Sequence, residues 1–330
     1  MRVLRARHMG MCFGVRRAIV RALAAAERQP LTVFGDLVHN ESVLADLRAR
    51  GIRTCTEVGD ISTATVMVTA HGASERRLAE LRARNLRVLN ATCPLVRAAR
   101  QAVDVLVASG CHPVIVGQRG HVEVRGLVED LDAHDVVLDE WEVDGLRERP
   151  RFGIAAQTTQ PVERVERIAA LVRERFPRSE IEVMNTVCVP TRLRQQSAEA
   201  LARQADVVLV VGGARSNNTR ELAVTCRRHC ARVVHVQAAD DVRAEWLQGA
   251  HVVGITAGTS TPDDVIDGVE AAVKALGNEA AALTWAARDC DATVDTHKTA
   301  MYAASMYSGL SPSQPAAALT ERSGRGHRHP

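Results

Sequence analysis

The sequence predicts an α/β protein built from parallel sheets with helices on their faces. Largely apolar runs, such as 64–69 and 206–211, are typical of strands that are buried on both faces. Segments with apolar residues at helical spacing alternate with these runs along the chain. A chain of 330 residues is also too long for one ordinary core, so two or three domains are expected.

The predicted elements fall into three parts of about 90 residues each. The first part contains, in order, a helix at 15–26, a strand at 31–35, a helix at 41–50, a strand at 64–69, a helix at 75–84 and a strand at 87–89. The second contains a helix at 95–107, strands at 113–117 and 152–156, a helix at 161–176 and a strand at 181–183. The third contains a helix at 191–204, strands at 206–211 and 251–255, and a helix at 262–276. No sequence repeat accompanies this pattern, so any threefold similarity is expected in the structure alone.

The composition argues against a nucleic-acid partner. Hydrophobic residues make up 46% of the chain but aromatic residues only 3%, so stacking platforms for single strands are not expected. The formal net charge is +3, and the arginines are dispersed along helices instead of forming one basic stripe.

The amino-terminal residues and the cysteine content predict a cytoplasmic protein without a membrane segment. Residues 1–8 lack the apolar centre of a signal peptide, and no apolar run approaches the roughly 20 residues that span a bilayer. Eight cysteines in a reducing compartment favour free thiols or metal ligation over structural disulfides.

Polar residues follow the predicted strands at the points where these strands end. They are His39, Asn40, His71, His121, Glu123, Thr158, Thr159, Ser216, Asn217, Asn218 and Ser260. In open α/β sheets the ligand lies over this carboxyl edge. Imidazoles, amides, hydroxyls and Gly-rich backbone suit an anionic phosphate. The sequence has neither a Walker lysine motif nor G-x-G-x-x-G, so an ordinary nucleotide site is not indicated.

Most of the cysteines are best explained as small core residues. This interpretation is favoured for Cys55, Cys111 and Cys290. Cys226 and Cys230 are close enough in sequence to bind a metal, but they lie in a helical pattern without a second pair. A structural role is therefore favoured for that pair as well.

Cys12, Cys93 and Cys188 differ because each lies at the end of a strand or loop and none has a close partner in sequence. Zinc sites and common ferredoxin clusters use closely spaced ligands. Widely spaced thiolates fit a cluster held where three domains meet, and three ligands would leave one iron of a four-iron cluster open to substrate. From the spacing alone, this is one interpretation among several.

Seven motifs in order resemble the hydroxymethylbutenyl diphosphate reductase family (IspH, also called LytB), over roughly residues 1–276. They are Met-Cys-Phe-Gly-Val at 11–15, Val-His-Asn at 38–40, Ala-His-Gly at 70–72, Ala-Thr-Cys-Pro-Leu-Val at 91–96, Gly-His-Val-Glu-Val at 120–124, Gln-Thr-Thr at 157–159 and Thr-Ala-Gly-Thr-Ser at 256–260. Any one of them alone would be weak evidence, but so many in the same order make chance an implausible explanation.

The resemblance implies a trefoil of three small α/β domains, in a pseudo-threefold arrangement around a central iron–sulfur cluster. The expected boundaries are 13–95, 96–188, and 189–276 together with 1–12, followed by a largely disordered extension at 277–330. It also implies a 4Fe–4S cluster with one open iron, ligated by Cys12, Cys93 and Cys188.

The implied reaction is reductive removal of the allylic hydroxyl of (E)-4-hydroxy-3-methylbut-2-enyl diphosphate. The products are isopentenyl and dimethylallyl diphosphate, formed in the last step of the non-mevalonate isoprenoid pathway. Glu123 would supply protons through Thr158 or the substrate's phosphate. The diphosphate would be bound by the residues at the strand ends: His39, Asn40, His71, His121, Thr158, Thr159, Ser216, Asn217, Asn218 and Ser260. The expected electron donor is a ferredoxin or flavodoxin.

Two departures from the family pattern keep alternatives open. The family usually has Ser-Ser-Asn where this chain has Ser216, Asn217 and Asn218, and the extension after Gly277 is longer than usual. One alternative is therefore a paralogue that keeps the cluster but acts as a redox sensor or a phosphate-ligand binding protein. Another is a metal-free α/β protein that binds sugar phosphates.

Overall fold

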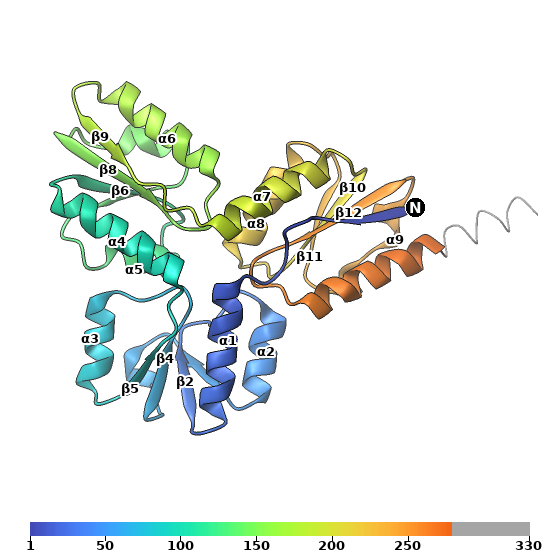
Figure 1. The fold of residues 1–330 in the computed structure, drawn as a ribbon, viewed down its shortest axis with the longest axis horizontal. Coiled ribbons are helices and arrows are strands. Elements are labelled where there is room, and N and C mark those ends of the chain that lie inside the picture. Colours follow the sequence, from blue (N-terminus) through green and yellow to red (C-terminus); the bar gives the residue numbers. More distant parts are fainter. Residues whose placement is uncertain (279–330) are drawn as a thin grey trace, which may run out of the picture. The chain divides into compact units, whose positions relative to one another are not determined.

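Three four-stranded sheets with one common strand order organise the chain (Figure 1). The computed structural model describes residues 1–278, and residues 1–277 form one compact unit. The sheet orders are β3-β2-β4-β5, β7-β6-β8-β9 and β11-β10-β12-β1, with all neighbours parallel. Each sheet therefore has the same plan, and the third is completed by the amino-terminal strand.

The bounds of the elements follow this threefold plan. The first sheet has β2 (Leu31–Phe34), β3 (Arg53–Cys55), β4 (Thr65–Val68) and β5 (Arg87–Asn90), with helices α1 (Phe13–Ala26), α2 (Glu41–Ala49) and α3 (Glu75–Ala83). The second has β6 (His112–Val116), β7 (Asp135–Val137), β8 (Arg151–Ala156) and β9 (Glu180–Val183), with α4 (Pro94–Ala108), α5 (Val122–Val128) and α6 (Val162–Arg175). The third has β1 (Arg2–Arg5), β10 (Val207–Val211), β11 (Val233–Val236) and β12 (Val252–Ala257), with α7 (Val189–Ala202), α8 (Asn217–Arg227), α9 (Ala244–Leu247) and a helix from residue 263 that is described to 278.

Helices cover both faces of each sheet, which explains the continuous apolar strands. In β10, Leu209 packs into the core that contains Ile266 of the last helix, whereas Val208 packs into the core formed with α7 and α8. Side chains alternate between the faces of a strand, so a strand covered on both faces needs apolar residues throughout. All five residues of β10 are fully buried.

The predicted α/β class is confirmed, and every predicted helix and strand is present within a few residues. The prediction missed β1, β3, β7 and β11, which are edge strands of three or four residues. Edge strands are only partly covered, so β3 contains Arg53 and β7 begins at Asp135, and neither shows an apolar run. It also missed the short helices α5 and α9, as well as the start of α8.

The remaining predictions concern the domain boundaries, the carboxyl-terminal extension and the membrane. The boundaries at 13–95, 96–188 and 189–276 stay a prediction, although each of the first two ranges contains one complete sheet. The extension at 277–330 lies outside the described residues except for positions 277 and 278. Among residues 1–278, no helix is both long and apolar enough to cross a bilayer.

Candidate functional site

The three widely spaced cysteines occupy equivalent places in the three sheets. Cys12, Cys93 and Cys188 are the N-cap residues of α1, α4 and α7, and none of their side chains caps its own helix. Each backbone N–H donates a 3.0 Å hydrogen bond to the loop that follows the neighbouring strand; the acceptors are the carbonyls of Thr259, Ala70 and Thr158, respectively. The same local construction is thus used three times, and it places each of the three thiols at the N-terminus of a helix.

The three thiols line one cavity of about 70 Å³. The cavity is completed by Phe13, Gly14, Val15, Ala70, His71, Leu95, Val96, Glu123, Thr158, Thr159, Pro190, Thr191 and Thr259. Gly14 lies so close that a Cβ atom added to it would be 2.6 Å from Cys93 Sγ and 4.0 Å from Cys12 Sγ. Residues from all three α/β parts of the chain therefore meet around the sulfur atoms.

Burial raises the pKa of two of these thiols above the usual value, and neighbouring donors offset part of that rise. Burial raises the pKa of Cys93, while the backbone N–H groups of Leu95 and Val96 lower it. Burial also raises the pKa of Cys188, and hydrogen bonds from the hydroxyl and backbone of Thr191 lower it. The Cys188 Sγ–Thr191 Oγ1 distance is 3.1 Å. Helix N-termini favour the anionic form of a thiol, and a bound metal deprotonates it outright.

The donor set fits an iron–sulfur cluster better than a single metal ion. Within residues 1–278, no group of three or more Cys, His, Asp or Glu residues is arranged to hold one ion. Thiolates are the ligands that select iron–sulfur clusters, whose several irons can reach sulfurs too far apart for one ion. The other lining residues are largely apolar, as required to shield a reduced centre from water.

Three histidines form a cluster beside this cavity. The rings of His39 and His71 stack with centroids 4.6 Å apart, and His121 lies edge-on to both, at 5.1 and 5.6 Å. Burial lowers the pKa of all three histidines, and that of His121 falls to about 3. The charges of neighbouring histidines lower the pKa of His71 and His121 further, and those of Arg215 and Arg220 lower the pKa of His39. All three imidazoles are therefore neutral at pH 7.

Unpaired buried polar atoms gather where these histidines meet the third sheet. Both ring nitrogens of His39, Nδ1 of His71 and Nδ2 of Asn218 have no hydrogen-bond partner within the described residues. They line a cavity of about 30 Å³ together with Val15, Val38, His121, Glu123, Thr159, Ser216, Asn217, Thr259 and Ser260. Buried polar groups without partners are costly, so this set fits an anion that accepts their hydrogen bonds. A cavity of this size holds about one water, so a diphosphate requires the lining side chains to move apart.

Glu123 joins the two cavities. Its side chain is 2% exposed and lines both the thiol cavity and the histidine cavity. The backbone N–H of Thr158 donates to Glu123 Oε1 at 2.6 Å. Burial raises the pKa of Glu123, and the two hydrogen bonds from Thr158 lower it in part. A carboxyl with a raised pKa in this position can hold a proton and release it to a bound molecule.

The structure brings together all but one of the predicted site residues. Asn40 does not line either cavity; its side-chain oxygen accepts hydrogen bonds from Val43 N and Ser42 Oγ and caps α2. Asn217 Nδ2 donates to Thr159 Oγ1 at 3.1 Å and so links the third part of the chain to the second.

Three residues near the thiols were not predicted as part of the site. Gly14, Thr191 and Arg194 were not assigned a role from the sequence. The Cys-x-x-Thr spacing at a helix N-terminus was the available signal for Thr191.

A larger, open groove of about 500 Å³ leads to the histidines. It is lined by His39 and His121 together with five arginines: Arg77, Arg119, Arg125, Arg215 and Arg220. Only two carboxylates, Asp36 and Glu129, line the same groove. Arg77, Arg119 and Arg215 are paired with carboxylates. Within residues 1–278, Arg125 and Arg220 have no ion pair, so these two can attract an anionic ligand toward the histidine cavity.

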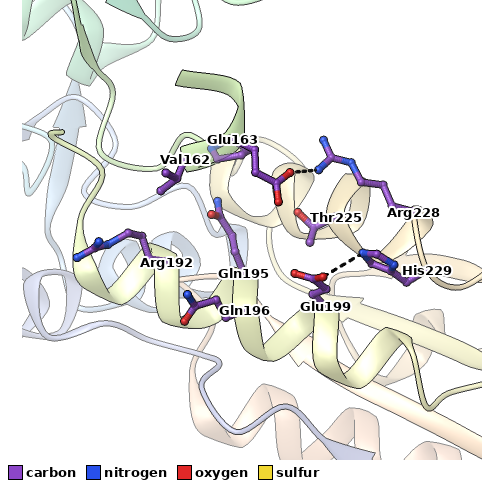
Figure 2. Close-up of a pocket in the computed structure, with 10 residues that line it drawn as sticks. Val162, Glu163, Arg192, Gln195, Gln196, Glu199, Thr225, Arg228 and His229 are labelled. Carbon is purple, nitrogen blue, oxygen red and sulfur yellow. Dashed lines mark hydrogen bonds and ion pairs between the residues drawn. The ribbon is translucent and has the colours of Figure 1, made fainter. Parts of the chain in front are cut away.

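Another cavity, of about 310 Å³, lies away from this chemistry. Figure 2 shows it between the start of α6 and the helices α7 and α8, with the Glu163–Arg228 and Glu199–His229 pairs across it. The paired atoms are 2.6 and 3.4 Å apart, and no cysteine lines this cavity. Its labelled acidic groups already have partners, so the candidate active site is the pair of cavities that share Glu123.

The fold and this site define an α/β protein with three clustered cysteines next to a candidate anion pocket. The model of the LytB protein family matches residues 3–274. Reductases named 4-hydroxy-3-methylbut-2-enyl diphosphate reductase from Syntrophotalea carbinolica and Pelobacter propionicus are 36% and 37% identical to the chain. The alignments cover 82% of this chain in both cases, and 97% and 96% of those proteins. The chain belongs to the LytB family.

Solved structures agree with this assignment. The (E)-4-hydroxy-3-methyl-but-2-enyl diphosphate reductase described as the terminal enzyme of the non-mevalonate pathway is 31% identical, with a TM-score of 0.59; the match covers 83% of this chain and 99% of that one. A reductase structure from Plasmodium falciparum has a TM-score of 0.76 at 24% identity and covers 81% of this chain and 86% of that one, which supports the fold. The α/β fold of this chain, with its three four-stranded parallel sheets, thus matches these structures and is consistent with the expected trefoil.

Proposed function

We propose that the protein is an iron–sulfur oxidoreductase that reductively removes the hydroxyl of (E)-4-hydroxy-3-methylbut-2-enyl diphosphate, giving isopentenyl and dimethylallyl diphosphate. The observation that carries this proposal is the position of Glu123. It lies in both the thiol-lined cavity and the cavity of unpaired polar atoms. A substrate with its diphosphate among the histidines would thus present its other end to both the proton donor and the thiols. Membership of the LytB family supports the same reaction.

The cofactor in this proposal is a 4Fe–4S cluster held by Cys12, Cys93 and Cys188. When bound, it supplies electrons and one open, Lewis-acidic iron to the substrate hydroxyl. The protein's own contribution begins with the N-termini of α1, α4 and α7, which stabilise the three thiolates. Val15, Ala70 and other apolar residues of the cavity would keep water away.

The histidine cavity would hold the diphosphate. Asn218 Nδ2, the ring nitrogens of His39 and Nδ1 of His71 are the unpaired groups at this place. Ser216 is the N-cap of α8 and Ser260 lies nearby, its hydroxyl 3.3 Å from the His39 carbonyl, so hydroxyls and a helix N-terminus complete the phosphate-binding set. Asn217 and Thr159 bond to each other and would be available to the diphosphate once that bond opens.

Glu123 would deliver the protons of the reaction. Loss of hydroxide is difficult, so a proton must reach the leaving oxygen, and reduction of the allylic carbon skeleton consumes a second proton. Burial raises the pKa of Glu123 and so favours its protonated form, and the Thr158 hydroxyl or the substrate's phosphate would relay the proton. The balanced change is loss of water after uptake of two electrons and two protons.

An external protein must supply the electrons, and we propose a ferredoxin or flavodoxin because these carriers deliver electrons singly. We also place the protein in the cytoplasm. All seven cysteines of residues 1–278 are free, and a reducing compartment preserves free thiols.

Turnover by the anaerobically reconstituted protein tests this function. With the hydroxymethylbutenyl diphosphate and a strong one-electron reductant, the products should be isopentenyl and dimethylallyl diphosphate. Cluster-containing protein that binds the diphosphate without turning it over would instead support a sensor or binding protein.

Protonation of the histidine cluster should accompany diphosphate binding. The histidines are neutral in the free protein, and an adjacent anion favours their charged forms, so binding raises their pKa values. Affinity should therefore be greatest at low pH and fall as pH rises through the pKa values of the complex. Calorimetry of inorganic diphosphate binding at pH 7, in buffers with different ionisation enthalpies, should reveal net proton uptake. The uptake should be unchanged in His112→Gln, since His112 pairs with Asp135 away from the site. A heat that does not depend on the buffer would contradict the expected coupling.

A further inference from the structure

Arg194 is a buried arginine on α7, six residues after Cys188, with an exposed fraction of 8%. Its Nε and Nη2 donate to the Gly10 carbonyl at 3.0 and 2.7 Å. Its Nη1 donates to the Pro190 carbonyl at 2.9 Å. One guanidinium therefore joins the segment just before Cys12 to the segment just after Cys188.

The charge of this guanidinium has no carboxylate partner in the part of the chain that the structure describes. All three of its hydrogen bonds go to neutral carbonyls. Arg164, a partly buried arginine, instead pairs with Glu221 at 2.6 Å. A buried charge is costly unless an opposite charge lies close to it. The compensation for Arg194 must then come from groups other than Asp and Glu.

The groups whose negative charge can compensate the Arg194 guanidinium are the thiolates of Cys12 and Cys188. Burial lowers the pKa of Arg194, and the charges of Cys12 and Cys188 raise it. Arginine keeps its proton in proteins, so the guanidinium is a permanent positive charge beside these ligands. Three thiolates around an iron–sulfur cluster carry net negative charge, and uptake of an electron adds to it.

We propose that Arg194 is a positioning residue with an electrostatic role: it fixes the Cys12 and Cys188 segments and raises the reduction potential of the cluster that these cysteines hold. This inference rests on the proposed function, because it needs the cluster. A fixed positive charge in a poorly solvated site stabilises the more negative, reduced state over the oxidised one. The same charge makes the cluster easier for a weak physiological donor to reduce.

A potentiometric titration of the holoprotein, followed by electron paramagnetic resonance, tests this role. Arg194→Gln removes the charge and should shift the reduction equilibrium at least tenfold toward the oxidised cluster, which is about 59 mV more negative for one electron. Arg203→Gln, at the exposed end of the same helix, removes an equal charge that is paired with Glu199 and should leave the potential unchanged. An unchanged potential in Arg194→Gln with a full cluster would overturn the proposal.

Arg194→Lys separates the charge from the hydrogen bonds. Lysine keeps the positive charge but cannot make the forked bond to the Gly10 carbonyl, so cluster content should fall while the remaining cluster keeps a near wild-type potential. This variant keeps the electrostatic role testable even if Arg194→Gln fails to assemble a cluster. A tenfold shift of the reduction equilibrium in Arg194→Lys would contradict that role, because the positive charge is still present. Wild-type protein without any cluster would instead refute the proposed function, so the two failures are distinguishable.

Discussion

We expect Glu123→Gln to lower kcat by about 10²–10⁴-fold, the usual contribution of a positioned proton donor. Glutamine has nearly the same shape, and its oxygen can still accept the 2.6 Å hydrogen bond from Thr158 N–H. It cannot release a proton at neutral pH, so the chemical step loses its donor. Steady-state kinetics with a strong reductant measures the effect, and cluster absorbance and diphosphate affinity should stay close to wild type.

The pH profile provides a second readout of the same role. Burial raises the pKa of Glu123, and the proposed mechanism requires its protonated form. The wild-type kcat should therefore fall as pH rises through this raised pKa, and the variant should lack that limb. Glu163→Gln is a matched control, because Glu163 pairs with Arg228 in the separate cavity of Figure 2 and should leave kcat unchanged. Wild-type turnover in Glu123→Gln would show that another group supplies the protons.

Gly14→Ala should weaken binding of the cluster, although alanine stabilises the α1 helix itself. Alanine is better than glycine in a helix by about 1 kcal/mol, so α1 alone would gain stability. The added Cβ would lie 2.6 Å from Cys93 Sγ, however, and would displace this ligand. We expect cluster affinity to fall about 10–100-fold, the range for losses around metal ligands. Iron content after anaerobic reconstitution and gel filtration measures the change.

Gly126→Ala is the matched control for that substitution. Gly126 is also helical, but its added Cβ would be 3.7 Å from the backbone of Ala73, an ordinary van der Waals distance. This variant should keep its iron. Equal iron content in Gly14→Ala and wild type would contradict this prediction. It would mean that Cys93 can still bind the cluster with a Cβ atom at position 14.

The sequence alone predicted the strands that are buried on both faces of their sheet. The strands β4 and β10 are continuous apolar runs, and they were predicted because each is central and covered twice. The edge strands β3 and β7 are short and polar, and their conformation depends on pairing with neighbours that local sequence does not reveal.

The candidate site was predicted in its residue types but not in its contacts. Cys12, Cys93 and Cys188 were recognisable as boundary residues, and the N-cap position of all three agrees with that interpretation. The role of Arg194 was not predictable, since its partners are backbone carbonyls and no side-chain pattern encodes them. For Asn40, the motif predicted a contact with the ligand. In the structure, its side-chain oxygen instead caps α2.

Iron and acid-labile sulfide content of anaerobically purified protein tests the central claim most directly. A cluster held by Cys12, Cys93 and Cys188 predicts about four irons and four sulfides per chain. Cys93→Ser should lose most of this content, whereas Cys226→Ser should keep it, because Cys226 is buried in the core between α7 and α8. Protein that contains no iron after reconstitution, or that keeps its full content in Cys93→Ser, would contradict the account.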